Sequence, residues 1–402
     1  MPKLKGSPAL PAEARIRTPL THVSGAETRQ GDPVAAERLA QAFRVTEADH
    51  QEAISGAHGL HPYPARIHPV IARRLVTALP ADTSILDPFC GSGTVLVEAR
   101  RARRYARGSD SNPIAVRLAR LRCIPAPNLE LVRQEADRCA DRCMERRDTP
   151  FAVFSKTERS YPKHVFAGLI SLRDEIEKTI NLKVRELLLF CFSPLLDKFA
   201  ARADREAPRV PRFAVRDNFL DRVARWLAFF EESKGWPFAE VEEADARWLP
   251  WKPLTSTAVI TSPPYPGVYD YAEAQARRAR WIGGADALMT TARRMEIGRK
   301  SDTGTPEDWT EGMSFALKQI SRTLKPDSPI FLVVADGVIR GRTVRVADLI
   351  ADLARSLRIL EPIACVSQER PHFHGPTQGA FANFPRQEHL IELRRIRAPD
   401  EA

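Results

Sequence analysis

The chain has 402 residues, of which 43% are hydrophobic and 28% charged, which is enough for one large α/β domain with an insertion and excludes a small disulfide-stapled scaffold. Its six cysteines lack regular spacing, which fits a reduced cytosolic compartment. The 61 lysines and arginines outnumber the 51 aspartates and glutamates, giving a formal net charge of +10. This charge fits either a polyanionic partner such as nucleic acid or an arginine-rich solvated surface.

No part of the sequence has the form of a membrane span or a secretory signal. The longest dense apolar stretch, Leu187 to Leu196, is interrupted by Ser193 and Pro194 and is much shorter than the roughly 20 residues that cross a bilayer. The first residues are basic and lack an apolar segment, unlike a signal peptide. We therefore expect a cytoplasmic protein without membrane contact.

In chain order, the sequence predicts first a tail and then the opening of an α/β sheet. Residues 1–45 are rich in proline, alanine and charge, which predicts a mobile basic tail with at most one helix, near Pro33 to Phe43. A helix is expected from Pro69 onward. A strand at 83–89, a glycine turn and a helix follow, and a second strand at 105–109 with its helix completes a βαβ unit.

Helical patterns then replace this alternation until the sheet resumes. We interpret residues 123–240 as a helical insertion and a candidate target-recognition region. Strand patterns return at 240–244, 257–260 and 330–334, with a helix at 306–324, and residues 362–368 and 389–396 predict a terminal hairpin. The main α/β domain is thus expected to comprise residues 46–122 and 241–396.

A glycine turn between the first strand and its helix is the first candidate site. Asp87-Pro88-Phe89-Cys90-Gly91-Ser92-Gly93-Thr94 lies where glycines let a ligand approach the backbone and a helix N-terminus offers free N–H groups. Asp110, at the end of the second strand, could accept both hydroxyls of a ribose. Leu96 stands where a dinucleotide motif would have its third glycine. This favours S-adenosylmethionine, a nucleoside without a pyrophosphate, over a nicotinamide dinucleotide. The alternative is an ordinary turn without a ligand.

Two further carboxylates would complete such a cofactor site. Asp87, at the end of its strand, could hold the charged amino group of S-adenosylmethionine. Asp245 follows the third strand, where a carboxylate or its neighbours could meet an adenine amino group.

Thr261-Ser262-Pro263-Pro264-Tyr265 directly follows the strand at 257–260 and is the second candidate site. Consecutive prolines fix the backbone and leave carbonyl oxygens as acceptors, which suits a substrate amino group. The Ser262 hydroxyl and the Pro263 carbonyl could hold the hydrogens of an exocyclic amine while it attacks a methyl sulfonium. Tyr265 offers a face on which a flipped base could lie. The alternative is a rigid Pro-Pro turn without chemistry.

These motifs together resemble the amino-group DNA methyltransferases, and among them the cytosine-N4 branch. Residues 87–94 match the D-P-F-x-G-S-G-T cofactor motif, Asp110 the second acidic position, and residues 262–265 the catalytic S-P-P-Y. The segment from His61 to Pro69 (HPYPARIHP) looks like the one that packs over the methionine end of the cofactor. Adenine-N6 and protein-glutamine enzymes usually have Asp or Asn where this chain has Ser262.

The resemblance implies a class I methyltransferase (Rossmann-like) fold, with a mostly parallel seven-stranded sheet whose last strand is antiparallel. It implies methyl transfer from S-adenosylmethionine to N4 of a flipped cytosine in double-stranded DNA. The implied catalytic residues are Ser262, Pro263, Pro264 and Tyr265. The implied cofactor-binding residues are Tyr63, Asp87, Pro88, Phe89, Gly91, Ser92, Gly93, Thr94, Asp110, Ser111, Asp245 and Thr261.

Several alternatives stay open at this point. An adenine-N6 DNA methyltransferase, an RNA or tRNA base methyltransferase, and a catalytically silent DNA-binding protein share the same sequence features. Many S-P-P-Y enzymes place the catalytic motif before the cofactor motif, whereas this chain has the reverse order, so the resemblance does not locate the target-recognition element. The sequence also leaves open whether a cognate restriction endonuclease accompanies the chain.

A basic segment beyond the catalytic motif is the candidate DNA contact. Basic residues interleaved with aromatic ones suit phosphate contacts and base stacking, although a solvated helix face is the alternative. The residues concerned are Arg277, Arg278, Arg280, Arg293, Arg294, Arg299 and Lys300. No metal is expected, because Cys139 and Cys143 lack a matching second pair and His372 with His374 resemble a ligand pair only superficially. Cys90 is expected to fill the turn without acting as a nucleophile.

Overall fold

A computed structural model of the protein describes residues 27–63, 66–145, 160–201, 206–211, 213–269, 271–285, 304–370, 379–381 and 384–397. The described strands are β1 (Glu27–Gly31), β2 (Ile85–Asp87), β3 (Ala106–Asp110), β4 (Ala239–Glu243), β5 (Ala258–Thr261), β6 (Pro329–Ala335), β7 (Gly337–Ile339), β8 (Arg342–Val344), β9 (Leu360–Glu369) and β10 (Gln387–Arg395).

The described helices are α1 (Pro33–Phe43), α2 (Glu47–Ala53), α3 (Pro69–Ala78), α4 (Thr94–Arg101), α5 (Pro113–Cys123), α6 (Leu129–Glu145), α7 (Lys163–Glu177), α8 (Leu182–Phe199), α9 (Ala214–Glu232), α10 (Tyr271–Ile282), α12 (Pro306–Thr323) and α13 (Val346–Leu357), with short 3₁₀ turns η2 (Gly56–His58) and η4 (Gly379–Phe381). None of these helices is both long enough and apolar enough to cross a membrane.

Eight strands form the central sheet in the order β1-β9-β10-β6-β5-β2-β3-β4. Strands β4, β3, β2, β5 and β6 pair in parallel, and β10 pairs antiparallel with both β6 and β9. Apart from β1, this is the class I methyltransferase fold that the sequence predicts, including the antiparallel last strand. The chain reverses its direction across the sheet between β2 and β5, and in open α/β sheets ligands bind at the carboxyl ends of strands beside such a reversal.

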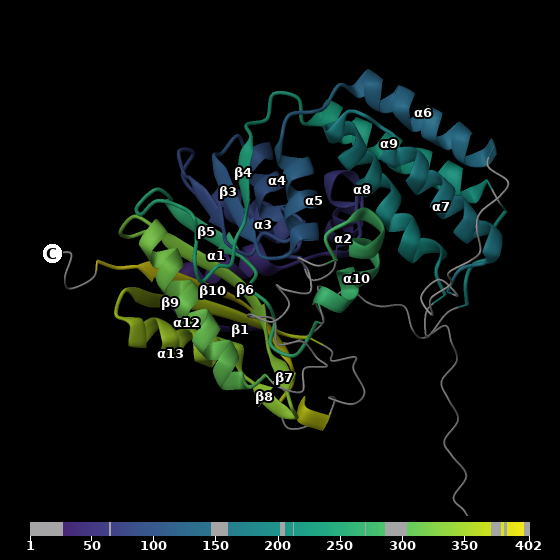
Figure 1. Ribbon diagram of the computed structural model, residues 1–402. Coiled ribbons are helices and arrows are strands. Elements are labelled where there is room, and N and C mark those ends of the chain that lie inside the picture. The colour runs from purple at the N-terminus through teal and green to yellow at the C-terminus, as the bar shows by residue number, and fades with distance from the viewer. Residues whose placement is uncertain are drawn as a thin grey trace, which may run out of the picture.

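Helices cover both faces of the sheet (Figure 1). On one face α1, α3, α4 and α5 bury apolar side chains such as Leu39, Leu75 and Leu96 against the strands. On the other face α12 and α13 do the same with Trp309, Leu317 and Ile350. The result is a three-layer α/β/α domain whose carboxyl strand ends are left for the site.

The helices begin where the local sequence provides a cap. In α1, α5 and α12 a proline occupies the first turn and the preceding Asp32, Asn112 or Thr305 accepts a hydrogen bond from a first-turn N–H. A proline costs nothing there because its missing N–H would have no partner in the helix.

The segment between α5 and β4 is helical, as the sequence predicts. Helices α6, α7, α8 and α9 lie to one side of the sheet (Figure 1) and form their own apolar core around residues such as Phe190, Phe219 and Trp226. This core is continuous with α10 and part of α5, through Ile282 and Leu118. The insertion is therefore packed on the main domain at the side of the cofactor turn.

The prediction of a mobile tail through residue 45 is wrong for residues 27–45. Strand β1 pairs antiparallel with β9 from Glu27 to Gly31 and adds an eighth strand to the expected seven. The sequence gives no signal for β1, because its mostly exposed polar side chains lack alternation and backbone hydrogen bonds alone hold it at the sheet edge. The helix expected at Pro33 to Phe43 is confirmed, and its apolar side packs on β9 and β10.

The sequence also does not predict the β7–β8 hairpin, which follows β6. Gly337 lies so close to the loop after the S-P-P-Y motif that a Cβ atom there would come within 1.7 Å of the Pro266 carbonyl oxygen. A Cβ on Gly267 would similarly approach the Val338 oxygen to 1.8 Å. The hairpin thus packs directly against the backbone of the loop that follows the S-P-P-Y motif and supports that loop.

Candidate active site

The glycine turn has the backbone that a close ligand approach requires. Gly91 and Gly93 have left-handed φ angles of +50° and +80°, which other residues adopt only with strain. Gly93 is the N-terminal cap of α4, and the Gly91 N–H donates to Asp110 Oδ2 at 2.8 Å. The turn therefore links the ends of β2 and β3, and both glycines and Asp110 lie together as the sequence predicts.

Asp110 is held at the end of β3 by backbone donors. Its Oδ1 accepts the Asn112 N–H at 2.8 Å and its Oδ2 accepts that of Gly91. Burial raises the pKa of Asp110 to about 6, although these backbone hydrogen bonds act in the opposite direction. A carboxylate has about four acceptor positions, so the backbone hydrogen bonds to Asp110 leave acceptor capacity for a ribose hydroxyl.

Asp87 is buried at the end of β2 and connects the two predicted motifs. Thr261, the last residue of β5, donates from Oγ1 to Asp87 Oδ1 at 2.6 Å, and the Phe89 N–H donates to the same oxygen at 3.3 Å. Burial raises the pKa of the Asp87 carboxyl to about 7, and the nearby Asp110 carboxyl also raises it. A cationic ligand would therefore be strongly preferred beside Asp87, because it would remove the cost of a buried charge.

The S-P-P-Y segment leaves β5 immediately beyond this hydrogen bond. The Pro264 carbonyl accepts a hydrogen bond from the Trp309 indole at 3.0 Å. Ser262 is half-buried, and within the described residues neither its hydroxyl nor the Pro263 carbonyl is engaged in a hydrogen bond. These two groups are the ones that the sequence assigns to a substrate amine.

Tyr265 lies deeper than the sequence predicts. Its side chain is only 8% exposed, and its hydroxyl donates to Glu388 Oε1 at 3.1 Å. The ring centroid of Tyr269 lies 6.3 Å away at a tilt of 50°. Little of the Tyr265 ring is open for a base to stack on in this structure, so its stacking role stays a prediction.

The segment from Ala57 to Tyr63 lies beside the cofactor turn. It shares residues 61–63 with the predicted His61–Pro69 segment, whose packing over the methionine end of the cofactor stays a prediction. Tyr63 is buried, and a Cβ on Gly91 would lie 3.5 Å from its ring. Arg122, fully buried at the end of α5, donates to the Ser92 carbonyl in the turn at 2.8 Å and to the Ala57 carbonyl at 2.5 Å. Arg122 therefore fixes this segment relative to the glycine turn.

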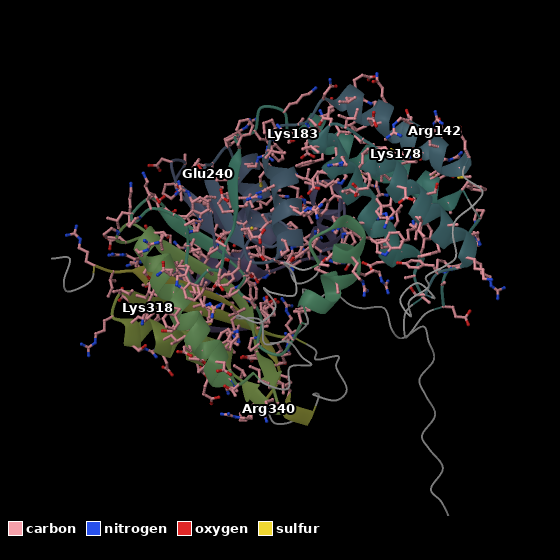
Figure 2. All side chains as sticks on the ribbon, viewed as in Figure 1. Arg142, Lys178, Lys183, Glu240, Lys318 and Arg340 are labelled. Carbon is pink, nitrogen blue, oxygen red and sulfur yellow. The ribbon has the colours of Figure 1, made fainter. Side chains whose placement is uncertain are left out.

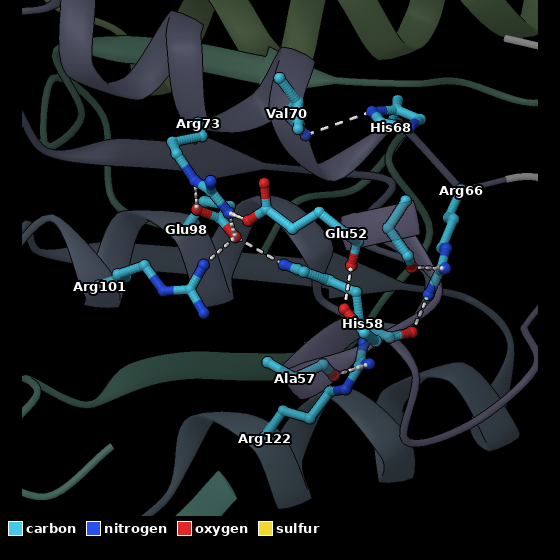
Figure 3. A network of polar contacts seen from close by, with 12 residues as sticks. Glu52, Ala57, His58, Arg66, His68, Val70, Arg73, Glu98, Arg101 and Arg122 are labelled. Atoms are coloured by element: carbon cyan, nitrogen blue, oxygen red, sulfur yellow. Dashed lines mark hydrogen bonds and ion pairs between the residues drawn. The ribbon is translucent and has the colours of Figure 1, made fainter. Parts of the chain in front are cut away.

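A buried ionic network anchors the same segment from its other side (Figure 3). Glu98 of α4 accepts hydrogen bonds from His58 at 2.5 Å, Arg73 at 2.8 Å and Arg101 at 3.1 Å. Burial opposes ionisation of Glu98, but the bonds from His58 and Arg73 outweigh it and hold its pKa at about 2. Burial lowers the pKa of His58 to about 4, so a neutral imidazole donates to an ionised carboxylate.

The sequence does not predict this network or the contacts of Arg122. The one local signal is Glu98 itself, a carboxylate within the apolar run Val95–Ala99. Its partners His58 and Arg73 come from η2 and α3, and no spacing relates them to Glu98. His61 adds a contact with the insertion, because its Nε2 lies 2.7 Å from Ser193 Oγ of α8.

The Asp245 carboxylate forms an ion pair with Arg247. Arg247 donates to both Asp245 oxygens at 2.9 and 2.7 Å, and its guanidinium lies 4.8 Å from the ring of Trp248. The neighbouring Ala244 N–H donates to the Asp110 carbonyl at 3.1 Å, which keeps this loop beside the cofactor turn. An adenine contact from Asp245 itself thus stays a prediction.

The predicted DNA-contact residues on α10 differ in how far they are exposed. Arg278 is 4% exposed and paired with Asp197 of α8, and the half-buried Arg277 lies 3.4 Å from the same carboxylate. Assigning Arg278 to phosphate contacts is therefore wrong, because its guanidinium joins α10 to the insertion. Arg280 is exposed, whereas Arg293, Arg294, Arg299 and Lys300 lie outside the described residues.

Exposed basic side chains are found elsewhere on the described surface. Arg142, Lys178 and Lys183 project outward from the insertion, and Lys318 and Arg340 lie on the α12 and β7–β8 side (Figure 2). Among the described residues the positive charge is thus spread over several faces and does not by itself mark one nucleic-acid surface.

Five of the six cysteines are buried, and Cys365 is half-buried. Cys139 and Cys143 are buried on α6, and the Cys143 thiol bonds to the Ala140 carbonyl within the helix. Cys90 is buried in the turn, and burial raises the pKa of its thiol well above the usual value, which leaves it without nucleophilic character. His372 and His374 lie outside the described residues.

The residues at the turn fit S-adenosylmethionine. The two left-handed glycines let a nucleoside approach the backbone, Asp110 has acceptor capacity left, and Asp87 is a buried carboxyl whose ionisation a cation would favour. Ser92 Oγ, Thr94 Oγ1 and Asn112 Nδ2 are buried around the turn without a hydrogen-bond partner in the described part of the chain. The site therefore has both the charge and the spare polar atoms that such a cofactor uses.

Comparison with known proteins agrees with this assignment at the level of the class. Residues 60–145, which contain the cofactor turn and Asp110, match the sequence family described as RMKL-like, methyltransferase domain. No curated protein sequence matches.

Solved structures show only distant overall likeness. A SAM-dependent methyltransferase from Methanosarcina mazei aligns over 83% of this chain and 99% of its own at 11% identity and a TM-score of 0.33. The rRNA methyltransferase AviRa from Streptomyces viridochromogenes aligns over 87% and 94% at 13% identity and a TM-score of 0.32. TrmN from Thermus thermophilus aligns over 87% of this chain and 52% of its own at 13% identity and a TM-score of 0.31.

The sheet order, the glycine turn with its acidic partners, and the matched methyltransferase segment define the class of this protein. It is a methyltransferase with the class I fold whose cofactor is S-adenosylmethionine.

Proposed function

We propose that this methyltransferase modifies the exocyclic amine of a nucleic-acid base, with N4 of cytosine as the target atom. The observation that carries the proposal is the 2.6 Å hydrogen bond between Thr261 and Asp87. It joins the carboxyl ends of neighbouring strands β5 and β2. The Ser262 hydroxyl and the Pro263 carbonyl, which follow Thr261 directly, are therefore next to the residues assigned to the cofactor. These acceptors suit a substrate that presents an amino group.

The chemistry divides between the cofactor and the chain. S-adenosylmethionine, when bound, supplies an electrophilic methyl group. Asp110 and the glycine turn would hold its ribose and Asp87 its amino group. The Ser262 hydroxyl and the Pro263 carbonyl accept the two amine hydrogens, which directs the nitrogen lone pair away from the base ring. Trp309 fixes the Pro264 carbonyl, so the loop that carries these acceptors does not have to order itself when substrate binds.

Two polynucleotides are candidate substrates. The S-P-P-Y resemblance favours cytosine in double-stranded DNA. The match to a methyltransferase domain fits an RNA base amine equally well. Neither the charge distribution nor the described residues of α10 favours one of them, because Arg278 is a structural ion pair.

Nucleoside mass spectrometry on cells that express the chain tests both candidates. DNA and RNA are digested separately from cells expressing the wild type, the Ser262→Ala variant, or the Asp110→Ala variant, which keeps S-P-P-Y but loses the ribose acceptor. We expect N4-methylcytidine or its deoxy form in one pool only, and only with the wild type. N6-methyladenine alone would refute the cytosine assignment, and equal methylation by Ser262→Ala would refute the role of the motif.

A further inference from the structure

A cluster of buried polar side chains lies on the far side of the S-P-P-Y motif from the cofactor turn. Its members come from the end of β9 and the start of β10: Gln368, Arg370, Arg386 and Glu388, each no more than 5% exposed. Glu388 is directly opposite Gln368 in the antiparallel register, and the Arg370 N–H donates to the Arg386 carbonyl at 2.8 Å. Alternate residues of a strand share a face, so these four side chains lie on the same face of the sheet.

Glu388 connects this cluster to the catalytic motif. One carboxylate oxygen accepts from the Tyr265 hydroxyl at 3.1 Å, and the other accepts from Arg370 Nε at 2.9 Å. Arg370 is further positioned by the ring of Phe43, whose centroid lies 5.7 Å from its guanidinium carbon. A single carboxylate thus orients both the last residue of S-P-P-Y and a fully buried guanidinium.

Several hydrogen-bonding groups of this cluster have no partner among the described residues. Arg370 Nη1 and Nη2 and Arg386 Nη2 are buried without a hydrogen-bond partner among the described residues, as is the acceptor Gln368 Oε1. Buried polar groups are nearly always paired in folded proteins. A pair of adjacent guanidinium nitrogens left open beside a substrate motif therefore points to a ligand that brings acceptors.

The position and charge of Arg370 indicate which part of a substrate it meets. In the sheet order, β6 and β10 lie on one side of β5 and the cofactor strands β2 and β3 on the other, so Arg370 is on the side of the methyl acceptor. Its side chain has no exposed surface, and its charge is already balanced by Glu388. A neutral acceptor suits this site better than a solvated phosphate, which would bring an excess negative charge into a buried position.

We propose that Arg370 recognises the target base, donating two parallel hydrogen bonds from Nη1 and Nη2 to adjacent acceptors on the base edge. Cytosine presents such a pair, ring N3 and carbonyl O2, next to its N4 amine. Adenine presents ring N1 next to its amine but a C–H beyond it. A planar guanidinium matches two adjacent acceptors, whereas a lysine ammonium is a single point charge. This inference rests on the proposed function and specifies its base.

The test compares Arg370→Lys with the wild type on random-sequence DNA and RNA pools, with labelled S-adenosylmethionine and nucleoside analysis. The matched control is Arg355→Lys, a surface substitution on α13. Calorimetry with S-adenosylmethionine and a thermal unfolding curve accompany each variant. We expect Arg370→Lys to bind the cofactor as the wild type does, while kcat/KM for cytosine methylation falls about 10- to 100-fold, the range of one bidentate base contact. The control should be unchanged.

A second measurement uses the wild type alone, so it does not depend on how the variant folds. Pools in which 2-thiocytosine replaces cytosine keep the amine but weaken the O2 acceptor, and we expect at least a 10-fold lower kcat/KM. Equal rates on both pools, or full activity of Arg370→Lys, would overturn the inference while leaving the proposed function intact. Cofactor binding without methylation of any base by the wild type would overturn both.

Discussion

Replacing Asp87 by asparagine isolates the effect of one buried charge in the cofactor site. The two hydrogen bonds that the Asp87 carboxylate receives, from Thr261 Oγ1 and the Phe89 N–H, both end on Oδ1. An asparagine with its amide oxygen in that place keeps both bonds. The substitution therefore removes the ionisable group and leaves the link between β2 and β5.

The size of the effect follows from the pKa of Asp87, which burial raises from 3.8 to about 7. A carboxyl whose pKa is higher in the folded than in the unfolded state favours the folded state at pH values below its unfolded-state pKa. That contribution is lost as the pH rises through the folded value. At about 1.4 kcal/mol per pKa unit, Asp87 should lower the free energy of unfolding by about 2–3 kcal/mol between pH 5 and pH 8. Asp110, whose pKa is raised to about 6, adds a similar slope to both proteins.

Denaturant unfolding of the cofactor-free wild type and of Asp87→Asn at pH 5, 6, 7 and 8 measures this difference. We expect the free energy of unfolding of Asp87→Asn, relative to that of the wild type, to increase by about 2–3 kcal/mol from pH 5 to pH 8. S-adenosylmethionine binding, measured by calorimetry at pH 8, should weaken at least about tenfold in the variant, because the cofactor loses the carboxylate that faces its amino group. Parallel pH dependences of the two proteins would refute the buried-charge argument, and unchanged affinity would refute the cofactor role of Asp87.

Three further predictions concern Arg278, Glu98 and Gly337. Arg278→Ala should lower the free energy of unfolding by about 2 kcal/mol, because it removes the hydrogen bond of a buried guanidinium to Asp197, which keeps Arg277 beside it. The exposed Arg280→Ala should change the free energy of unfolding by less than about 0.5 kcal/mol, and equal losses in denaturant unfolding would contradict the structural role of Arg278. Glu98→Gln should lower the free energy of unfolding at pH 7 by about 3 kcal/mol, because the pKa of the Glu98 carboxyl is held at about 2 in the folded state. Such a carboxyl stabilises the fold above pH 4.5, and this contribution is lost only as the pH falls through about 2. A free energy of unfolding at pH 7 equal to that of the wild type would show that the network does not stabilise the protein. Gly337→Ala, whose Cβ would lie 1.7 Å from the Pro266 oxygen, should displace the S-P-P-Y loop and reduce kcat with cofactor binding retained, and full activity in a steady-state methyl-transfer assay would contradict the packing argument.

Local sequence patterns predicted the parts of the site that depend on neighbouring residues. The turn needs glycine at Gly91 and Gly93 for its left-handed backbone, and Asp110 ends the next strand, so motif and spacing are visible without the fold. The strands β5 and β6 are apolar runs with buried faces, and their order along the chain already implies a parallel sheet.

The remaining parts of the site depend on contacts between distant segments. Tyr265 and Glu388 are 123 residues apart and Pro264 and Trp309 are 45 apart, and no periodicity relates these positions. Arg278 was predicted to face nucleic acid because it lies in a basic stretch, but the fold brings Asp197 of the insertion against it. Composition shows how many charges a segment carries, whereas only packing shows which of them are already paired.

The central claim is that a glycine-turn cofactor site and the S-P-P-Y loop act together on a base amine, and one reaction tests it most directly. Purified protein is incubated with methyl-labelled S-adenosylmethionine and with DNA or RNA lacking base methylation, and the labelled nucleosides are separated and identified. We expect label on the exocyclic nitrogen of cytosine with the wild type and no label transferred by Asp110→Ala. Label on a ring carbon, a ribose or a protein acceptor, or transfer that persists in Asp110→Ala, would contradict it.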